Sequence, residues 1–270
     1  MNGKLKSWEE AVLWLKELPD QKELVMACFY DDPLLAAAER YYESAEWQAV
    51  RTYLPEDCGK AIDIGAGRGI SSYALARDGW ATYALEPDSS EIVGAGAIRK
   101  LSNEANLNIH VKEEFGEKLP FADETFDLVY CRAALHHAND LLALCKEIGR
   151  VLKKGGRLIA TREHVISRKS DLEIFLKNHP LHQLYGGENA YLLAEYKAAI
   201  RSGGIDIIRV LNPYASDINL FPDTVDTVKT RIARKIKFPF PKMIPEFMVH
   251  WYGGLIQTPG RLYTFVGLKI

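Results

Sequence analysis

The sequence predicts an α/β fold with a doubly wound, mostly parallel sheet. Short apolar runs alternate with segments of helical periodicity from about residue 60 onward, which is typical of a parallel sheet covered by helices on both faces. A glycine-rich turn follows the first apolar run, and an acidic residue ends the second. Folds of this class bind nucleoside-bearing ligands at such a turn.

The first fifty residues predict three helices that precede the sheet. Ser7 with Glu10, and Asp20 with Glu23, have the spacing of capping boxes. Asp32-Pro33 reads as a cap followed by a first-turn proline. Such a prefix either covers the ligand site or simply packs against the sheet, and its candidates for a lid are Phe29, Tyr30 and Tyr41.

The remaining elements follow in order along the chain. Strands are expected at 60–64, 81–85, 108–112, 126–131, 156–162, 205–211 and 262–270. Helices are expected at 69–78, 89–104, 139–152 and 191–202. About fifty residues separate the last two strands, and we interpret them as an insertion.

Three alternating glycines form the turn after the first strand. Gly65, Gly67 and Gly69 let the backbone turn sharply and let a ligand approach where a Cβ would collide. The pattern overlaps the dinucleotide fingerprint, but Ile70 stands where its third glycine would be. Glu86, at the end of the second strand, is placed to accept both hydroxyls of a ribose, with a solvated acid as the alternative.

Further motifs give the chain a family resemblance. DIGAGRG at 63–69 is followed by LPF at 119–121, LHH at 135–137 and RVLKKGG at 150–156. In this order and spacing, roughly residues 58 to 165 resemble the class I S-adenosylmethionine-dependent methyltransferases of the small-molecule type. The resemblance implies a seven-stranded Rossmann-like sheet whose last strand is antiparallel.

The resemblance also implies a cofactor and a division of the chain. S-adenosyl-L-methionine is the expected cofactor, and the residues expected to bind it are Asp63, Gly65, Ala66, Gly67, Glu86, Pro87, Phe115, Gly116 and Arg132. The expected parts are an N-terminal helical cap at 1–54, the cofactor-binding core at 55–212, an insertion at 213–260 and the last strand at 261–270.

One position departs from the family pattern. An Asp that contacts the adenine amino group in this family is replaced here by Phe115, which is followed by Gly116. We expect Phe115 to stack on the adenine, with the Gly116 amide and Leu119 completing the slot. The alternative is that Glu114 reaches the adenine amine.

Composition narrows the classes of function. The chain has 270 residues and a net charge of −2, which gives no indication of nucleic-acid binding. Its four cysteines lack metal-ligand spacing, and no secretory or membrane-spanning segment is apparent, so a cytoplasmic location is expected. No metal is expected either, because Pro180 breaks the helix that would align His179 with His182. The oligomeric state stays open.

The acceptor is expected at the carboxyl ends of the fourth and fifth strands, where open parallel sheets bind ligands. Arg132 is placed to pair with a carboxylate or phosphate of the acceptor. The residues at 132–135 replace the Asn/Asp-Pro-Pro-aromatic tetrad of enzymes that methylate base amines, so that activity is disfavoured. The histidines at 136 and 137 act either as bases or in packing.

Two later segments supply the remaining polar groups. Glu163 and His164 end the fifth strand, where alternation aims only one of them into the cleft. The segment 179–191 packs imidazoles, a phenol, a carboxylate and an amide around a glycine turn. It serves acceptor recognition, or is a structural loop with Asn189 as the cap of the next helix.

From these segments we draw two sets of candidates. The candidate general bases are His182, His164 and Glu163. The candidate acceptor-binding residues are Arg132, His137, Tyr185, Glu188 and Asn189.

The insertion combines basic residues with an apolar, aromatic run. Basic residues recur from Lys229 to Lys242, and the run 243–252 follows them. This pattern fits contact with an anionic lipid head group, a nucleoside diphosphate, a phosphate-bearing glycan or a membrane surface, or else a solvated face.

The function expected from these observations is O-methylation of a hydroxylated small molecule or a glycan-type intermediate. The region after residue 162 resembles uncharacterised bacterial methyltransferases of surface-glycan or secondary-metabolite type. Two alternatives remain: a catalytically silent module that binds S-adenosylmethionine, and an NAD-dependent dehydrogenase. The dehydrogenase would need the third dinucleotide glycine that Ile70 replaces.

Overall fold

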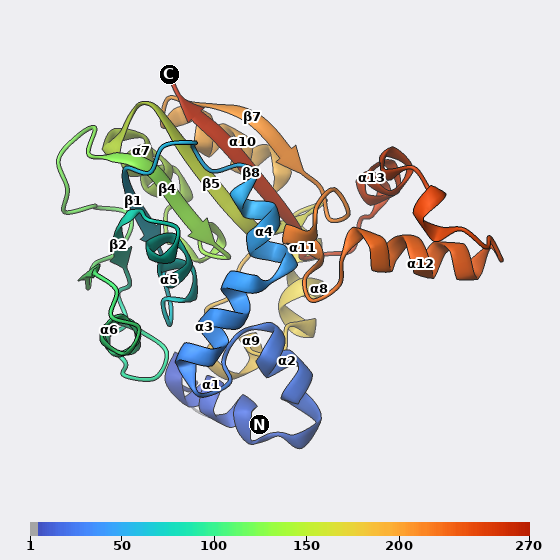
Figure 1. Cartoon of the computed structure of the whole chain (residues 1–270), viewed down its shortest axis with the longest axis horizontal. Helices are drawn as coiled ribbons and strands as arrows, with labels where there is room; N and C mark the ends of the chain where they lie inside the picture. The colour runs from blue at the N-terminus through green and yellow to red at the C-terminus, as the bar shows by residue number, and fades with distance from the viewer. Residues whose placement is uncertain (1–4) are drawn as a thin grey trace.

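The computed structural model describes residues 5–270 and contains one eight-stranded sheet (Figure 1). Its order is β3-β2-β1-β4-β5-β8-β7, with β6 paired to the end of β5. The strands are β1 (Lys60–Ile64), β2 (Ala81–Leu85), β3 (Ile109–Lys112), β4 (Phe126–Arg132), β5 (Leu152–Ile166), β6 (Tyr191–Leu192), β7 (Ile205–Leu211) and β8 (Arg261–Lys269). Only β8 runs antiparallel to its neighbours. The expected mostly parallel fold is confirmed, with the two-residue β6 added.

Helices cover both faces of the sheet. One face is covered by α7 (Leu141–Val151) and α10 (Leu193–Ser202). The other is covered by α3 (Leu34–Glu43), α4 (Ala45–Arg51), α5 (Ile70–Arg77) and α11 (Asp217–Leu220). Side chains of β4 alternate between these two cores: Leu128 and Tyr130 join one, Val129 and Cys131 the other. Burial on both faces explains the almost continuous apolar runs of the central strands.

Residues 5–59 form four α-helices rather than the three expected. Helices α1 (Trp8–Glu17) and α2 (Lys22–Ala27) precede α3 and α4, with a short 3₁₀ turn at Pro19–Gln21. The capping box of Ser7 and Glu10 is confirmed by reciprocal hydrogen bonds of 3.1 and 2.8 Å. The one expected from Asp20 and Glu23 is wrong, because Asp20 lies inside the 3₁₀ turn and α2 begins without a side-chain cap.

Two other expected caps are also wrong. Helix α3 begins at Leu34, and Asp32 pairs with Arg68 and Lys16 rather than capping it. Helix α10 begins at Leu193, whereas the side-chain oxygen of Asn189 accepts a hydrogen bond from the amide of Ala190. The side chain of Asp32 is therefore engaged in ion pairs, and that of Asn189 in a hydrogen bond to the next residue, so neither caps a helix.

Helix α6 (Ala95–Glu104) starts later than the periodicity predicts. The Ser90 hydroxyl accepts hydrogen bonds from the amides of Ile92 and Val93, which holds a turn before the helix. Strand β5 is longer than expected and continues to Ile166, where β6 pairs with it. Helices α8 (Asp171–Asn178) and α9 (His182–Tyr185) lie between them in the chain.

The segment between β7 and β8 contains more than α11. Helix α12 (Val225–Lys235), a 3₁₀ turn at Pro241–Met243 and α13 (Glu246–Leu255) form a hairpin that projects from the rest of the molecule (Figure 1). Val228, Ala233, Ile244 and Val249 form its own small core.

Helices α7 and α10 pack too closely for a side chain at Gly149. A Cβ there would lie 1.8 Å from the carbonyl oxygen of Gly203, at the end of α10. We predict that Gly149→Ala lowers the free energy of unfolding by about 2 kcal/mol, because the helices must separate. Denaturant titration measures the effect. The control is Gly254→Ala in α13, where the nearest atom is 3.7 Å away and helix propensity favours alanine. Equal stability of the two variants would contradict the close contact.

Candidate functional site

A cavity of about 510 Å³ lies where the carboxyl ends of β1, β4 and β5 meet the N-terminal helices. Its walls come from Trp8 and residues 27–30, the glycine turn at 65–68, residues 86–88, the ends of β4 and β5, and the loop that contains Glu188. Because this edge is where parallel sheets bind ligands, the cavity is the candidate site.

The glycine turn borders the cavity and requires glycine for two reasons. Gly65 and Gly67 have φ of +68° and +54°, in the left-handed region. A Cβ on Gly65 would lie 2.8 Å from the Cβ of Ala134. A Cβ on Gly67 would meet no atom within 4 Å, so this residue keeps open space beside the turn. Ala66 lines the cavity between them.

Glu86 faces the same turn. Its carboxylate accepts hydrogen bonds from the amides of Gly67, at 2.7 Å, and Asp88, at 3.0 Å. Burial raises the pKa of Glu86 to about 7, although these amide bonds oppose the rise. Pro87 lies beside it in the cavity wall. The carboxylate is therefore held on the wall where the resemblance expects a ribose.

Asp63 supports the turn from behind rather than lining the cavity. It is fully buried, and one carboxylate oxygen accepts 2.7 Å hydrogen bonds from the hydroxyls of Ser71 and Ser72 at the start of α5. Its other oxygen has no hydrogen-bond partner among the described residues. Burial raises the pKa of Asp63 to about 6.

Phe115 and Gly116 also lie outside the cavity wall. The Phe115 side chain is 62% exposed. Gly116 backs onto the core, where a Cβ would lie 2.6 Å from Leu144. Stacking of Phe115 on adenine therefore stays a prediction, since this ring does not contribute to the wall.

Arg132 lines the cavity, but its charge is already paired. Its guanidinium donates to both carboxylate oxygens of Glu46, at 2.7 and 3.0 Å, and stacks near the rings of Phe29 and Tyr41. Glu46 is fully buried, and Arg162 lies 3.7 Å from it. Burial alone would lower the pKa of Arg132, but Glu46 raises it. The guanidinium is fixed, as expected, but Glu46 rather than an acceptor anion is its partner here, so pairing with an acceptor carboxylate or phosphate stays a prediction.

Glu163 is unavailable as a general base. Its carboxylate accepts 3.1 Å hydrogen bonds from the amides of Ala134, Leu135 and His136, and lies 2.8 Å from Nδ1 of His136. It is fully buried and outside the cavity wall. The expectation of Glu163 as a base is wrong, because its oxygens already hold the loop after β4.

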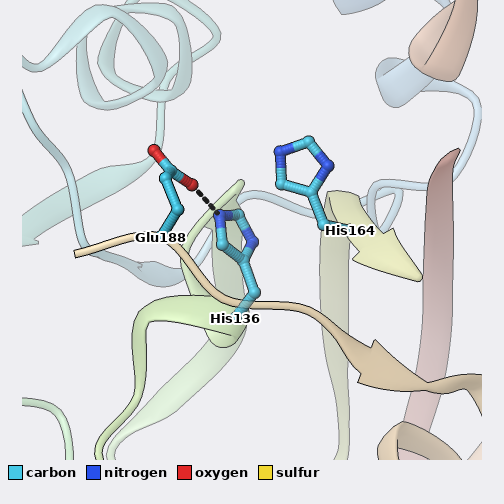
Figure 2. A group of neighbouring side chains, drawn as sticks. All are labelled: His136, His164 and Glu188. Atoms are coloured by element: carbon cyan, nitrogen blue, oxygen red, sulfur yellow. Dashed lines mark ion pairs between the residues drawn. The ribbon is translucent and has the colours of Figure 1, made fainter. Parts of the chain in front are cut away.

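His136 and Glu188 face each other across the cavity floor (Figure 2). Nε2 of His136 lies 3.7 Å from the Glu188 carboxylate, which also accepts a 2.6 Å hydrogen bond from the Tyr185 hydroxyl. Burial opposes protonation of His136, but Glu163 and Glu188 outweigh it and raise its pKa to about 9. Burial likewise opposes ionisation of Glu188, yet the neighbouring histidines hold its pKa low.

His164 and His137 each have one ring nitrogen, Nε2, without a hydrogen bond among the described residues; that of His137 lies 4.0 Å from the Glu188 carboxylate. Nδ1 of His164 lies 2.7 Å from the carbonyl of Gly260, and Nδ1 of His137 lies 3.0 Å from the carbonyl of Gly187. A carbonyl only accepts, so Nδ1 carries the proton in both rings and Nε2 keeps its lone pair. Burial and the charge of His136 lower the pKa of both histidines, that of His164 to about 3.

The loop at 179–191 contributes only in part to the cavity. Tyr185, Glu188 and His179 line it, and Nδ1 of His179 lies 3.7 Å from the Glu188 carboxylate. His182 instead borders a separate surface groove beside α8, and Asn189 lines neither. The structure therefore does not bring His182 or Asn189 to the cavity wall, and their roles as a base and as an acceptor contact stay predictions without support from this geometry.

The N-terminal helices close the cavity from the other side. Phe29 and Tyr30 line it, whereas the Tyr41 hydroxyl bonds to Tyr130 in the core, at 3.0 Å. Arg68, in the glycine turn, donates to the carbonyls of Phe29 and Asp31.

Glu46 and Arg68 were not among the expected site residues. In the sequence, Glu46 looks like an ordinary surface acid of a helix. No motif indicates that it pairs with Arg132.

Comparison with known proteins agrees with this geometry. The family described as "Methyltransferase domain" matches residues 62–160. An uncharacterised methyltransferase, YcgJ of Bacillus subtilis, is 30% identical over 128 residues, which cover 44% of this chain and 46% of that protein. A dimethylglycine N-methyltransferase of Parasynechococcus marenigrum is 34% identical over 105 residues, covering 38% and 37%.

A solved structure extends the likeness of fold beyond the matched segment. Geranyl diphosphate C-methyltransferase from Streptomyces coelicolor covers 97% of both chains with a TM-score of 0.63 and 14% identity. At that identity the match concerns the fold alone. The sequence matches, by contrast, span about half the length or less of the curated relatives. The matched segment 62–160 contains both the glycine turn and the buried acid after β2, so in this segment the chain is similar to the class I S-adenosylmethionine-dependent methyltransferases.

Proposed function

We propose that the protein is an enzyme that transfers a methyl group from S-adenosyl-L-methionine to a hydroxyl of a small molecule or glycan-type acceptor. The observation that carries this proposal is a single cavity with two unlike ends. One end has the glycine turn and Glu86, and the other has four histidines, Tyr185 and Glu188.

The residues at the first end fit the cofactor. Gly65, Ala66 and Gly67 leave room for the amino-acid and ribose parts, and Glu86 is held to accept ribose hydroxyls. When bound, the cofactor supplies a methyl group already activated by the sulfonium. The protein's task is then to align the acceptor, exclude water and remove a proton.

His137 is our candidate for the proton acceptor. Its Nε2 lone pair is fixed by the bond to Gly187 and faces the cavity, where its side chain is 40% exposed. As the acceptor oxygen attacks, its O–H bond breaks and the proton goes to Nε2. A bound cofactor would supply the methyl group for the new O–CH₃ bond, and the electrons of its S–CH₃ bond would stay on sulfur.

Other acceptor atoms are represented among the similar proteins. One is named for an N-methyl transfer and another for a C-methyl transfer, so the names do not select the atom. We favour oxygen because the polar wall offers neutral imidazole nitrogens and a phenol to a hydroxyl. A silent binding module would bind the cofactor without releasing its methyl group.

Cofactor binding should depend on pH through Glu86. Its pKa of about 7 means that the carboxylate becomes ionised between pH 6 and pH 8, and a charged acceptor binds hydroxyls more strongly. We predict that the affinity for S-adenosylhomocysteine rises about five- to tenfold over this interval. Calorimetry measures it. Glu86→Gln should bind more weakly at pH 8 and lose the pH dependence; an unchanged pH profile would count against the ribose contact.

The role of His137 can be separated from binding. We predict that His137→Gln lowers the turnover number by a factor on the order of 10² with little change in affinity for S-adenosylhomocysteine, because only proton removal is lost. Methyl release into a pooled library of hydroxylated acceptors provides the assay. His182→Gln, outside the cavity, is the matched control. Equal rates of His137→Gln and wild type would rule out this base.

We further propose a cytoplasmic location at an anionic membrane surface. The four cysteines are free, in support of a reducing compartment. Within residues 5–270, no helix has the length and apolar character needed to cross a bilayer.

Helix α13 provides the proposed peripheral contact. Its exposed stripe has the spacing of one helix face and consists of Phe247, Met248, Trp251, Tyr252 and Leu255. The opposite side is buried through Val249 and Gly253. Residues 234–255 contain four basic residues and one acidic residue, so the segment that carries the apolar stripe has a net positive charge. This combination favours anionic lipid over a neutral partner.

Vesicle sedimentation tests this surface. We predict binding to vesicles of phosphatidylcholine with phosphatidylglycerol, and about tenfold weaker binding to phosphatidylcholine alone. Trp251→Ser should weaken binding about tenfold, whereas Trp14→Ser, on exposed α1, should not. Equal binding of both variants, or a dimer in solution that Trp251→Ser dissociates, would overturn the lipid assignment.

A further inference from the structure

Three potential metal ligands that line the cavity lie close together, as Figure 2 shows. His136 comes from the turn after β4, His164 from β5, and Glu188 from the loop before β6. One ligand atom from each lies within 4.8 Å of the other two. His136 and Glu188 are almost fully buried.

The two imidazoles are held in the way that metal-binding histidines are held. Nδ1 of His136 bonds to the Glu163 carboxylate at 2.8 Å, and Nδ1 of His164 bonds to the Gly260 carbonyl at 2.7 Å. Such outer partners fix the tautomer and leave Nε2 free to coordinate. Glu188 is oriented in turn by the Tyr185 hydroxyl, at 2.6 Å.

Ion pairing of His136 with the carboxylates of Glu163 and Glu188 explains why these three residues lie together, but not why His164 joins them. It accounts for Glu163 and Glu188, but His164 is left with a lone pair on Nε2 to which none of the described residues donates a hydrogen bond. Two imidazole rings with centroids 4.7 Å apart would repel if both were charged. A shared cation instead satisfies both nitrogens and the carboxylate.

We propose that His136, His164 and Glu188 bind one first-row divalent cation, such as Zn²⁺, Fe²⁺ or Mn²⁺. Two imidazoles and one carboxylate are a donor set that these ions prefer. Coordination at about 2.1 Å requires ligand atoms roughly 3 Å apart, so the side chains would draw together on binding. His179 and His137, which flank Glu188, are the nearest additional donors.

The site has a defined place in the cavity. It shares the cavity with the glycine turn, so the ion is positioned to hold an oxygen of the acceptor. That role rests on the proposed function. Binding of the ion does not, because it can be measured without turnover.

Metal binding is tested on the full chain, freed of any affinity tag and treated with a chelator. We expect one equivalent of Zn²⁺ to bind in competition with a chromophoric chelator, and Co²⁺ to give visible d–d absorption. His164→Gln and Glu188→Gln should each weaken Zn²⁺ binding at least about 100-fold and abolish the Co²⁺ spectrum. His182→Gln, in the separate groove beside α8, should leave both unchanged.

The readouts distinguish this inference from the proposed function. Retained affinity for S-adenosylhomocysteine in His164→Gln and Glu188→Gln shows that these variants fold and keep the cofactor end intact. Lack of binding by Zn²⁺, Co²⁺, Fe²⁺ and Mn²⁺ in wild type, or equal binding in both variants and wild type, would overturn the metal site. If the wild-type protein does not bind S-adenosylhomocysteine, the proposed function is overturned instead.

Discussion

The rest of the site depends on the hydrogen bonds that the buried carboxylate of Glu163 accepts. It lies on β5 but binds three successive amides after β4 and one ring nitrogen of His136. A buried carboxylate without hydrogen bonds would destabilise the fold. The amides of the loop after β4 provide these hydrogen bonds, which fixes the conformation of the loop. The orientation of His136, and through it the contacts of Glu188, follow from this single anchor.

The end of the cavity formed by the glycine turn and Glu86 could be predicted from the sequence because its signals are local. Glycines at alternate positions, an apolar strand before them and an acid about twenty residues later are constraints on backbone conformation and ligand approach. Each acts within a short segment, so neighbouring residues reveal it. Asp63 was the exception: the motif contains it, but only the structure shows its carboxylate turned toward Ser71 and Ser72.

The end of the cavity lined by histidines could not be predicted in the same way, because segments distant in the sequence build it. Alternation on β5 correctly allows only one of Glu163 and His164 to face the cavity, but it does not say which. His179 and His182 are three residues apart, and the turn into α9 sends only the first to the cavity. The partner of Arg132 is Glu46, 86 residues away, on a helix that carries no functional motif.

Arg68 gives the glycine turn a second attachment, to the N-terminal helices. Its side chain is almost fully buried, donates to the carbonyls of Phe29 and Asp31, and pairs with Asp32. The segment that roofs the cavity and the turn that borders it therefore share one guanidinium group. Displacing the N-terminal segment therefore breaks hydrogen bonds made by the glycine turn itself, so the two walls of the cavity cannot move apart without loosening the turn.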